Sequence, residues 1–143
     1  MRTVRQLLEA KAPEVFAIGP VAPVIDAIRL MAEKRIGALL VMQAGKLAGI
    51  VSERDYARKI VLQGRSSRDT PVRDIMTADV VSIGLDDTTD RCMQLVTDRR
   101  IRHLPVLDGG RLLAFVSIGD LVKHRLELVE HEAEAMRDYI RTA

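Results

Sequence analysis

A serine and an aspartate three residues apart occur twice in the chain. The first pair is Ser52 and Asp55, and the second is Ser117 and Asp120. Each pair follows an apolar run and opens a predicted helix, whose free N–H groups favour phosphate or another anion. The carboxylate can accept two hydrogen bonds, which suits the adjacent 2′ and 3′ hydroxyls of a ribose. The same spacing also forms a capping box, which punctuates a helix without any ligand.

The two pairs belong to an internal repeat with an offset of 65 positions. This offset aligns Arg35-Ile36 with Arg100-Ile101 and Val51-Ser52 with Val116-Ser117, with no gap between them. A shared register over most of a small protein indicates two copies of one supersecondary unit that cover each other's apolar faces. Residues at matched positions are therefore candidates for a paired site.

Each copy is predicted to fold as a β-α-β-β-α unit after a short helical lead-in, which gives an α/β (α+β) fold class. The first copy has a predicted lead-in at 4–11, a strand at 15–18, a helix at 23–34 and strands at 38–42 and 47–52. The second copy has a lead-in at 72–76, a strand at 80–83, a helix opened by residues 86–88 and strands at 103–107 and 112–117. Helical spacing of apolar residues supports the helices, and the turns at 43–46 and 108–111 have hairpin chemistry. A last helix begins at Glu53 in one copy and at Ile118 in the other.

The predicted domain boundaries follow from this pattern. Copy 1 with its lead-in spans residues 1–64, a polar linker spans 65–71, copy 2 spans 72–126 and a C-terminal amphipathic helix spans 127–143. Along the last helix, apolar residues step by four and three positions through Val122, Leu126, Val129, Ala133, Met136 and Ile140. A helix of this kind needs a partner surface in water, either its own subunit or a second copy.

The composition excludes several classes of protein. A content of 48% hydrophobic and 29% charged residues is that of a globular domain rather than a disordered chain. A net charge of +2 with interspersed signs does not favour nucleic acid. No apolar run reaches membrane-spanning length, and the N-terminus lacks the apolar core of a secretory signal. Cys92 is the single cysteine, which excludes an internal disulfide and fits a reducing compartment. A cytoplasmic protein without a membrane or nucleic-acid partner is expected.

No catalytic or metal-binding constellation is visible in the sequence. His103, His124 and His131 do not cluster with cysteines or carboxylates at ligand spacing, and the last two are expected to be solvated. Gly45-Lys46 lacks the other residues of a phosphate-cradling loop. Cys92 lies on a predicted inner helix and is expected to be a buried structural thiol rather than a nucleophile. The chain is therefore not expected to be an enzyme or to hold a metal.

The complete pattern resembles a tandem pair of cystathionine-β-synthase (CBS) domains over residues 4–126. The resemblance rests on the two Ser-x-x-Asp junctions and on the run Arg102-His103-Leu104-Pro105-Val106 before an Asp-Gly turn. It implies two units packed through their sheets about a pseudo-twofold axis. It also implies two clefts, each able to hold an adenosine ligand such as AMP, ATP, NAD(H) or S-adenosylmethionine.

Carried over residue by residue, the resemblance gives each candidate a role. Asp55 and Asp120 would bind ribose, and Ser52 and Ser117 would lie near phosphate. The residues expected to flank the base are Ile18, Ala38, Ile83 and the strand at 39–41. The cations expected to reach phosphate are Arg54, Arg58, Arg102, His103 and Lys123. Of these, Arg58 and Lys123 fit a solvated helix surface equally well.

The chain departs from the family pattern at positions that make the two clefts unequal. Ala17 stands where the first strand of the family usually has threonine, and Ala114 replaces the motif glycine that is present as Gly49. Gly119 stands where the first copy has Arg54, so the second copy lacks that cation. One cleft is therefore expected to be empty or to bind a different ligand.

Two functions from different classes remain. The first is a regulatory module that senses an adenine nucleotide or dinucleotide and signals through a partner protein, without a catalytic cofactor. The alternative is an interaction or scaffold protein that has kept the fold and lost the ligand. Both aspartates and Arg54 favour the sensor, because a helix cap needs no arginine. A homodimer is expected from the resemblance, and the regulated partner is expected to be encoded elsewhere.

Overall fold

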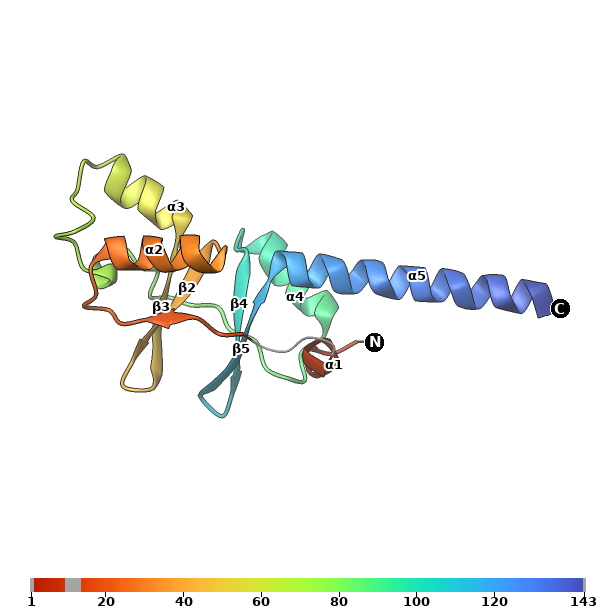
Figure 1. Ribbon diagram of the computed structural model, residues 1–143. Helices are drawn as coiled ribbons and strands as arrows, with labels where there is room; N and C mark the ends of the chain where they lie inside the picture. The colour runs from red at the N-terminus through yellow and green to blue at the C-terminus, as the bar shows by residue number, and fades with distance from the viewer. Residues whose placement is uncertain (1, 10–13, 143) are drawn as a thin grey trace.

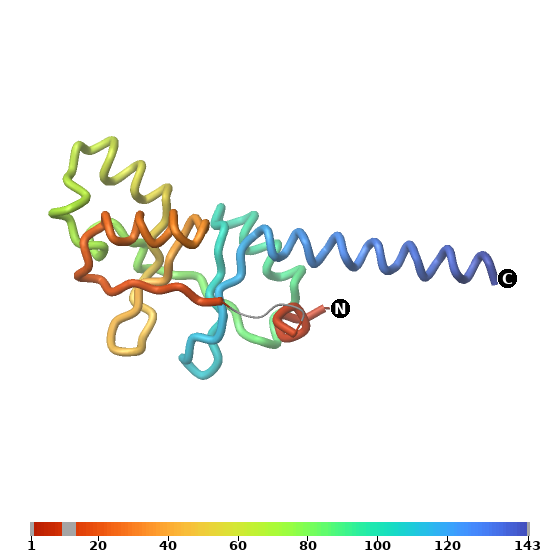
Figure 2. The backbone as a smooth tube through the Cα atoms, in the orientation of Figure 1, coloured from red at the N-terminus to blue at the C-terminus, as the bar shows by residue number. Residues whose placement is uncertain are grey.

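Two small sheets lie side by side in the computed structural model, and one long helix projects from the body (Figure 1, Figure 2). The structure describes residues 2–9 and 14–142. The sheets meet where β3 (Lys46–Ser52) contacts β5 (Arg111–Ser117), and the projecting helix is α5 (Ile118–Thr142). The predicted α+β class, with two related units and a C-terminal helix, is confirmed.

Repeat 1 contains a three-stranded sheet in the order β1-β2-β3. The strand β1 (Ala17–Ile18) is parallel to β2 (Ala38–Gln43), which pairs with β3 in antiparallel fashion. Between β1 and β2, α2 (Val24–Lys34) buries Val24, Ala27 and Met31, which share one helix face. After β3, α3 (Glu53–Tyr56) continues as the π-helical turn η1 (Ala57–Val61).

Repeat 2 contains the antiparallel hairpin of β4 (His103–Asp108) and β5. The helix α4 (Thr89–Asp98) begins after Thr88, whose hydroxyl accepts a 3.0 Å hydrogen bond from the N–H of Arg91. This is the cap that the polar run at 86–88 predicted. Both hairpins close with two-residue turns at 44–45 and 109–110, where all four φ values lie between 51° and 81°. These are the turns that match the twist of paired strands, and they fix the register of each hairpin.

The strand predicted at 80–83 is reduced to a single parallel bridge between Ile83 and Val106. In repeat 1, the N–H of Leu40 donates a 3.3 Å hydrogen bond to the carbonyl of Phe16, which extends the pairing of β1. The counterpart of Leu40 in repeat 2 is Pro105, which has no N–H to donate. The ladder of repeat 2 therefore stops one bond earlier, and the strand prediction was wrong for its first residues.

The two lead-in segments are exchanged between the repeats. The helix α1 (Val4–Glu9) places Val4 and Leu7 in the apolar core of repeat 2. The turn η2 (Val72–Asp74) and the residue that follows it place Val72 and Ile75 in the core of repeat 1. Ala10 and Lys11, the end of the predicted first lead-in, lie outside the described residues. The sequence pattern attached each lead-in to the copy that follows it, whereas each one packs on the other copy.

Backbone hydrogen bonds hold the exchanged segments in place. The N–H of Val4 donates to the carbonyl of Asp87 at 2.9 Å, and the N–H of Val72 donates to the carbonyl of Ala22 at 2.8 Å. The two repeats cannot separate without exposing part of both cores to water, so burial of these lead-ins stabilises the pair as one unit.

The helix α5 continues without a break through residue 126. The sequence analysis placed a domain boundary at this residue, and that boundary stays a prediction. The first turns of α5 lie on the body, with Leu121 buried, and its distal part is exposed (Figure 1). His131 is exposed as expected, but His124 is half-buried and its Nε2 atom has no hydrogen-bond partner among the described residues. The prediction of a solvated His124 was wrong because α5 packs this side chain toward the body. None of the described helices is long and apolar enough to cross a bilayer.

Cys92 is fully buried on the inner face of α4, as the sequence predicted. Burial raises the pKa of its thiol to about 11, and the nearby Asp87 carboxylate adds to this effect. The thiol is therefore protonated at neutral pH and has the environment of a structural side chain.

Candidate functional site

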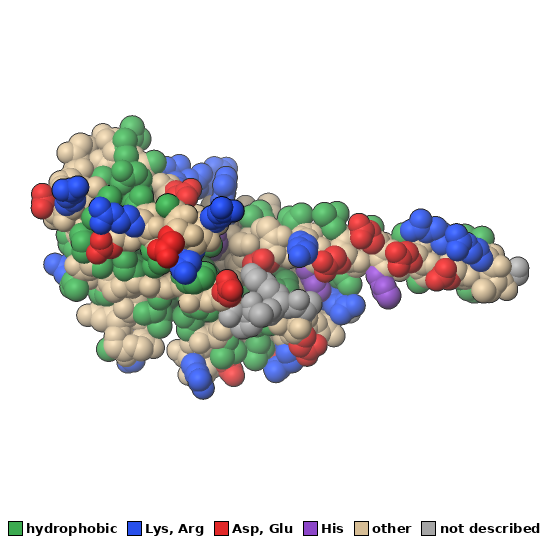
Figure 3. Space-filling model, in the orientation of Figure 1, with side chains coloured by type: hydrophobic (Ala, Val, Ile, Leu, Met, Phe, Trp, Pro, Cys, Tyr) green, Lys and Arg blue, Asp and Glu red, His purple; other side chains and the backbone are tan. Residues whose placement is uncertain are grey.

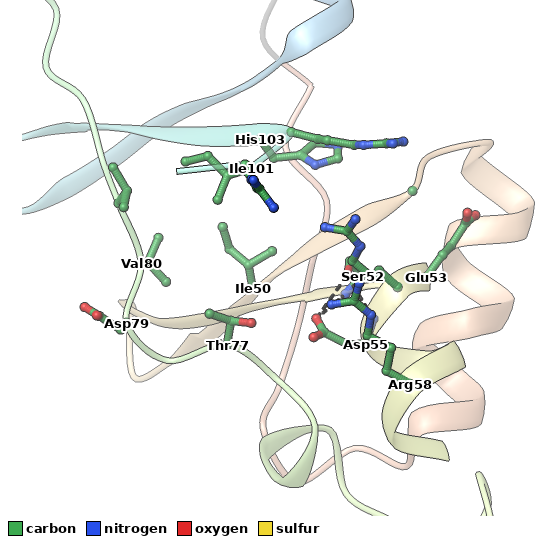
Figure 4. A pocket seen from close by; sticks show the side chains of 15 residues that line it. Ile50, Ser52, Glu53, Asp55, Arg58, Thr77, Asp79, Val80, Ile101 and His103 are labelled. Carbon is green, nitrogen blue, oxygen red and sulfur yellow. Dashed lines mark hydrogen bonds between the residues drawn. The ribbon is translucent and has the colours of Figure 1, made fainter. Parts of the chain in front are cut away.

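A cleft of about 450 Å³ opens between the repeats at the Ser52–Asp55 junction (Figure 4). Its volume lies within the range of small-molecule sites. One wall comes from repeat 1 and carries Ser52 and Asp55. The other wall comes from repeat 2 and includes residues 79–81 and 100–103. Both copies therefore contribute to one site, which the repeat alone had not shown.

The exchanged lead-in forms the floor of this cleft. Thr77 follows η2 and pairs with Ile50 of β3, and both backbone N–H groups donate, at distances of 2.8 and 2.9 Å. This close approach requires glycine at position 49. A Cβ atom on Gly49 would lie 2.7 Å from the carbonyl oxygen of Thr77 and 2.9 Å from the sulfur of Met76. Gly49 is thus a packing requirement of the floor.

Asp55 and Ser52 form a complete capping box at the start of α3. The Oδ2 atom of Asp55 accepts hydrogen bonds from the backbone N–H and the hydroxyl of Ser52, each at 3.0 Å. The Ser52 hydroxyl in turn accepts from the N–H of Asp55 at 3.1 Å. The Asp55 side chain is 13% exposed at the edge of the cleft. The bond network fixes its orientation, and the dashed lines in Figure 4 show it.

Lys59 occupies the other oxygen of Asp55, and the sequence analysis did not select it. Its Nζ atom lies 3.3 Å from Oδ1 of Asp55 and donates a 2.8 Å hydrogen bond to the carbonyl of Ile75. A carboxylate offers about four lone-pair sites, and three are occupied by Ser52 and Lys59. One site on Oδ1 remains for a ligand hydroxyl unless Lys59 moves. The sequence did contain a signal for this contact, because a lysine four residues after an aspartate on a helix can form an ion pair with it.

Four arginines line the cleft. Arg54, Arg58 and Arg102 were selected from the sequence as cations that could reach phosphate, which stays a prediction, and Arg100 was not selected. The arginine side chains are exposed, so they can reorient toward an anion. Arginine binds phosphate through two parallel hydrogen bonds. The cleft can therefore hold an anionic group.

The cleft is also lined by four apolar side chains and by the exposed carboxylate of Asp79. The apolar side chains are those of Ile50, Val80, Val81 and Ile101, and Figure 4 shows Ile50, Val80 and Ile101 turned toward one another. None of these residues was selected from the sequence, because only the exchanged lead-in brings Val80 against β3. An apolar surface of this kind suits the flat face of an aromatic base.

His103 lies at the cleft as predicted, but its character differs from that of the arginines. Its ring stacks on Phe115, with centroids 5.1 Å apart. Burial lowers the pKa of His103 below its ordinary value of 6.5; Asp120 opposes this effect and Arg102 adds to it. The imidazole is therefore neutral at pH 7 and acts there as a hydrogen-bonding group rather than a cation.

The other predicted site residues are not among those that line this cleft. Ser117 and Asp120 form a second capping box, with hydrogen bonds of 2.9 and 3.1 Å. Lys123 is exposed on α5. The remaining three are core or sheet residues, namely Ile18 in β1, Ala38 in β2 and Ile83 beside β4. The second site stays a prediction.

Residues 2–9 and 14–142 contain no group of three or more His, Cys, Asp and Glu side chains that could hold a metal ion. The cleft combines apolar side chains, an oriented carboxylate and several guanidinium groups.

Comparisons with known proteins identify the family. The family model for the CBS domain matches residues 4–62 and 72–127, so the chain belongs to the CBS-domain family and carries two such domains in tandem. Paired CBS domains are generally regulatory modules. The resemblance drawn from the sequence is confirmed.

Individual relatives agree with this assignment. The chain is 45% identical over 119 residues to the CBS domain-containing protein CBSX3, mitochondrial, of Arabidopsis thaliana, with 80% of this chain and 57% of the relative covered. It is 31% identical to the CBS domain-containing protein YhcV of Bacillus subtilis, with 79% and 80% covered. A solved structure of a protein with CBS domains from Burkholderia ambifaria MC40-6 is 54% identical, with a TM-score of 0.85 and 87% and 94% covered. The chain thus spans little more than half the length of CBSX3.

Proposed function

We propose that the cleft between the repeats binds an adenosine ligand, such as AMP, ATP or NAD(H), and that the chain regulates a partner protein rather than catalysing a reaction. The observation that carries the proposal is that the Asp55 carboxylate, four apolar side chains and four arginines line the same cleft. An adenine nucleotide has groups that match all three, namely an apolar base, a ribose with hydroxyls and an anionic phosphate. CBS domains commonly bind such ligands.

The proposed orientation follows from the walls of the cleft. The base lies against Ile50, Val80 and Ile101, where burial of its faces removes apolar surface from water. The ribose 2′ hydroxyl donates to Oδ1 of Asp55, which keeps one free lone-pair site beside Lys59. The phosphate binds the guanidinium groups of residues 54, 58, 100 and 102.

The alternative is a ligand-free scaffold, and one observation favours it. The capping box at Ser52 and Asp55 is complete without a ligand, and Lys59 already pairs with the carboxylate. In a ligand-free scaffold, the Ser-x-x-Asp motif would serve only as a helix cap. This alternative leaves unexplained why four arginines line the same cleft, since like charges repel one another without an anion between them.

We further propose that the protein acts in the cytoplasm as a homodimer. The charge pattern and the single cysteine favour a reducing compartment. The name of CBSX3 places that relative in mitochondria, so the compartment can differ within the family. The regulated partner is proposed as a separate protein that contacts the outer surface of the pair.

A thermal-shift experiment with AMP, ADP, ATP, NAD, NADH, S-adenosylmethionine and adenosine tests the proposal. A ligand present at 100 times its dissociation constant stabilises the folded protein by about 2.7 kcal/mol. We expect at least one phosphorylated ligand to raise the melting temperature of the wild type, and the same concentration of ligand to raise that of Asp55→Ala by less. If no ligand shifts the melting temperature, the scaffold reading is correct.

A further inference from the structure

The distal part of α5 exposes an apolar stripe to water. From Val129 to Thr142 each residue is exposed, and Val129, Met136 and Ile140 are 52%, 61% and 65% exposed. The helix extends away from the body, with apolar and charged side chains on its surface (Figure 1, Figure 3). A single helix of about this length is marginally stable in water. A second surface that covers the stripe would stabilise it.

The stripe has the seven-residue spacing of a coiled coil. Its members alternate steps of four and three, which assigns Val122, Val129 and Met136 to d positions and Leu126, Ala133 and Ile140 to a positions. A strict seven-residue repeat keeps a seam facing a partner helix that supercoils with it. A helix packed on its own globular body does not require this spacing.

The charges beside the stripe select the orientation of the partner. Arg125 and Glu132 occupy g positions, and Glu130 and Arg137 occupy e positions. In a parallel, in-register pair, each g residue faces the e residue five positions later in the other helix. Arg125 then faces Glu130 of the partner helix, and Glu132 faces Arg137, so both complete pairs carry opposite charges.

Antiparallel pairings fit the same surface less well. With the whole stripe covered, Glu130 would face a second Glu130, and Glu132 a second Glu132, which is unfavourable. Sliding the helices by one heptad would bring Glu130 opposite Arg137 but would leave Val122 and Leu126 uncovered. The parallel arrangement alone covers all six apolar positions with opposite charges on both sides.

Arg125, a member of these pairs, also has a contact inside the body. Its Nη1 atom donates to Asp90 at 2.9 Å. A guanidinium carries five N–H donors, so this contact leaves donors for a glutamate of the partner. The exposed ion pair contributes little stability by itself.

We infer that α5 forms a parallel, in-register two-stranded coiled coil with α5 of a second copy of this chain. The inference rests on the homodimer proposed above and goes beyond it by fixing the surface, the orientation and the register. It does not depend on whether the cleft binds a ligand, so either proposal can fail without the other.

Cysteine crosslinking of the full chain tests the register. Met136→Cys places a thiol at a d position that meets itself in the parallel pair, whereas Asp138→Cys places one on the outer face of the same turn. Under mild oxidation we expect Met136→Cys to form a covalent dimer and Asp138→Cys to remain monomeric on a denaturing gel. Wild type serves as a further control because Cys92 is buried. If Met136→Cys crosslinks no faster than Asp138→Cys, the parallel register is wrong. Val129 and Ala133 face each other in an antiparallel pair that covers the whole stripe, so if a mixture of Val129→Cys and Ala133→Cys crosslinks mainly between the two variants, the pair is antiparallel.

Charge reversal tests the ion pairs, with sedimentation measured at micromolar concentrations and folding checked by circular dichroism. Glu132→Arg should weaken the dimer by about tenfold, because two symmetry-related attractions become repulsions. Adding Arg137→Glu should restore most of that loss. Glu134→Arg, the same change at an outer b position, should leave association within about twofold of wild type. A monomeric wild type, or a double variant no tighter than Glu132→Arg, overturns the inference.

Discussion

Thr77 and Ile50 join the two repeats through a pair of backbone hydrogen bonds, 2.8 and 2.9 Å long. Thr77 belongs to the segment that enters repeat 2, and Ile50 belongs to β3 of repeat 1. Both residues line the cleft. The floor of the proposed ligand site is thus the same structure that fixes one repeat to the other, so changes in this pairing act on folding and on binding together.

Gly49→Ala is expected to destabilise the protein by about 1–3 kcal/mol, as overpacking of a close contact does. Its Cβ atom would meet the Thr77 carbonyl at 2.7 Å, and that backbone is held by the pairing with Ile50. Gly19→Ala is the matched control, because no atom lies within 4 Å of its added Cβ atom. Its free energy of unfolding, measured by urea denaturation, should stay within about 0.5 kcal/mol of wild type. Equal stabilities of the two variants would show that the floor relaxes freely.

Arg54→Gln is expected to weaken AMP binding by about tenfold and adenosine binding by less than about twofold, because a guanidinium contacts phosphate and not the nucleoside. The salt dependence of AMP binding should flatten in the same variant. Arg68→Gln removes an exposed arginine of the linker, outside the lining of the cleft, and should change neither affinity. Titration calorimetry at two salt concentrations measures these effects. An equal loss for adenosine and AMP would exclude a phosphate contact at Arg54.

His103 is expected to make stability depend on pH in the weakly acidic range. Burial lowers the pKa of His103 in the folded protein below its ordinary value of 6.5. As the pH falls below that value, the unfolded chain binds a proton that the folded chain does not, so the free energy of unfolding decreases. Above that value His103 is neutral in both states and this contribution vanishes.

His103→Gln should remove this part of the pH dependence while Asp120 and Arg102, the charged neighbours of His103, stay in place. The measurement is the difference in free energy of unfolding between variant and wild type, taken at pH 7 and at lower values. As the pH falls, the free energy of unfolding of the variant should increase relative to that of wild type. A constant difference across the range would mean that His103 titrates normally in the folded protein.

The parts of the fold that depend on short-range patterns were predictable from the sequence. The two hairpins, the helix after Thr88 and both Ser-x-x-Asp caps follow from turn residues, capping residues and periodicity. The strand residues predicted before Ile83 are missing because Pro105 has no N–H to pair with them. Comparing Pro105 with Leu40 in the other copy could have shown this, whereas the periodicity of apolar residues could not.

The exchange of the lead-ins was not predictable in the same way. Val4 and Val72 have the same apolar character, and nothing local decides which of two similar cores each one enters. For the same reason, the complete set of residues that line the cleft could not be predicted from the sequence. Ser52 and Asp55 could be found as a motif, but Val80 and Ile101 join the site only through tertiary packing. The position of the Lys59 side chain likewise depends on tertiary packing, because its Nζ atom donates a hydrogen bond to the Ile75 carbonyl of the exchanged segment.

The most direct measurement is titration calorimetry of AMP with wild type, Asp55→Ala and Asp120→Ala. Both aspartates hold equivalent capping boxes, so each variant should lose about 0.5–2 kcal/mol of stability. At the cleft between the repeats, Asp55→Ala should weaken AMP by roughly tenfold to a hundredfold, since hydrogen bonds to a charged group contribute about 1.5–3 kcal/mol. Asp120→Ala should leave that affinity unchanged, and 2′-deoxy-AMP should lose part of the same energy in wild type. Equal AMP affinities for wild type and Asp55→Ala, or for AMP and its 2′-deoxy analogue, would contradict the account and leave Asp55 as a helix cap.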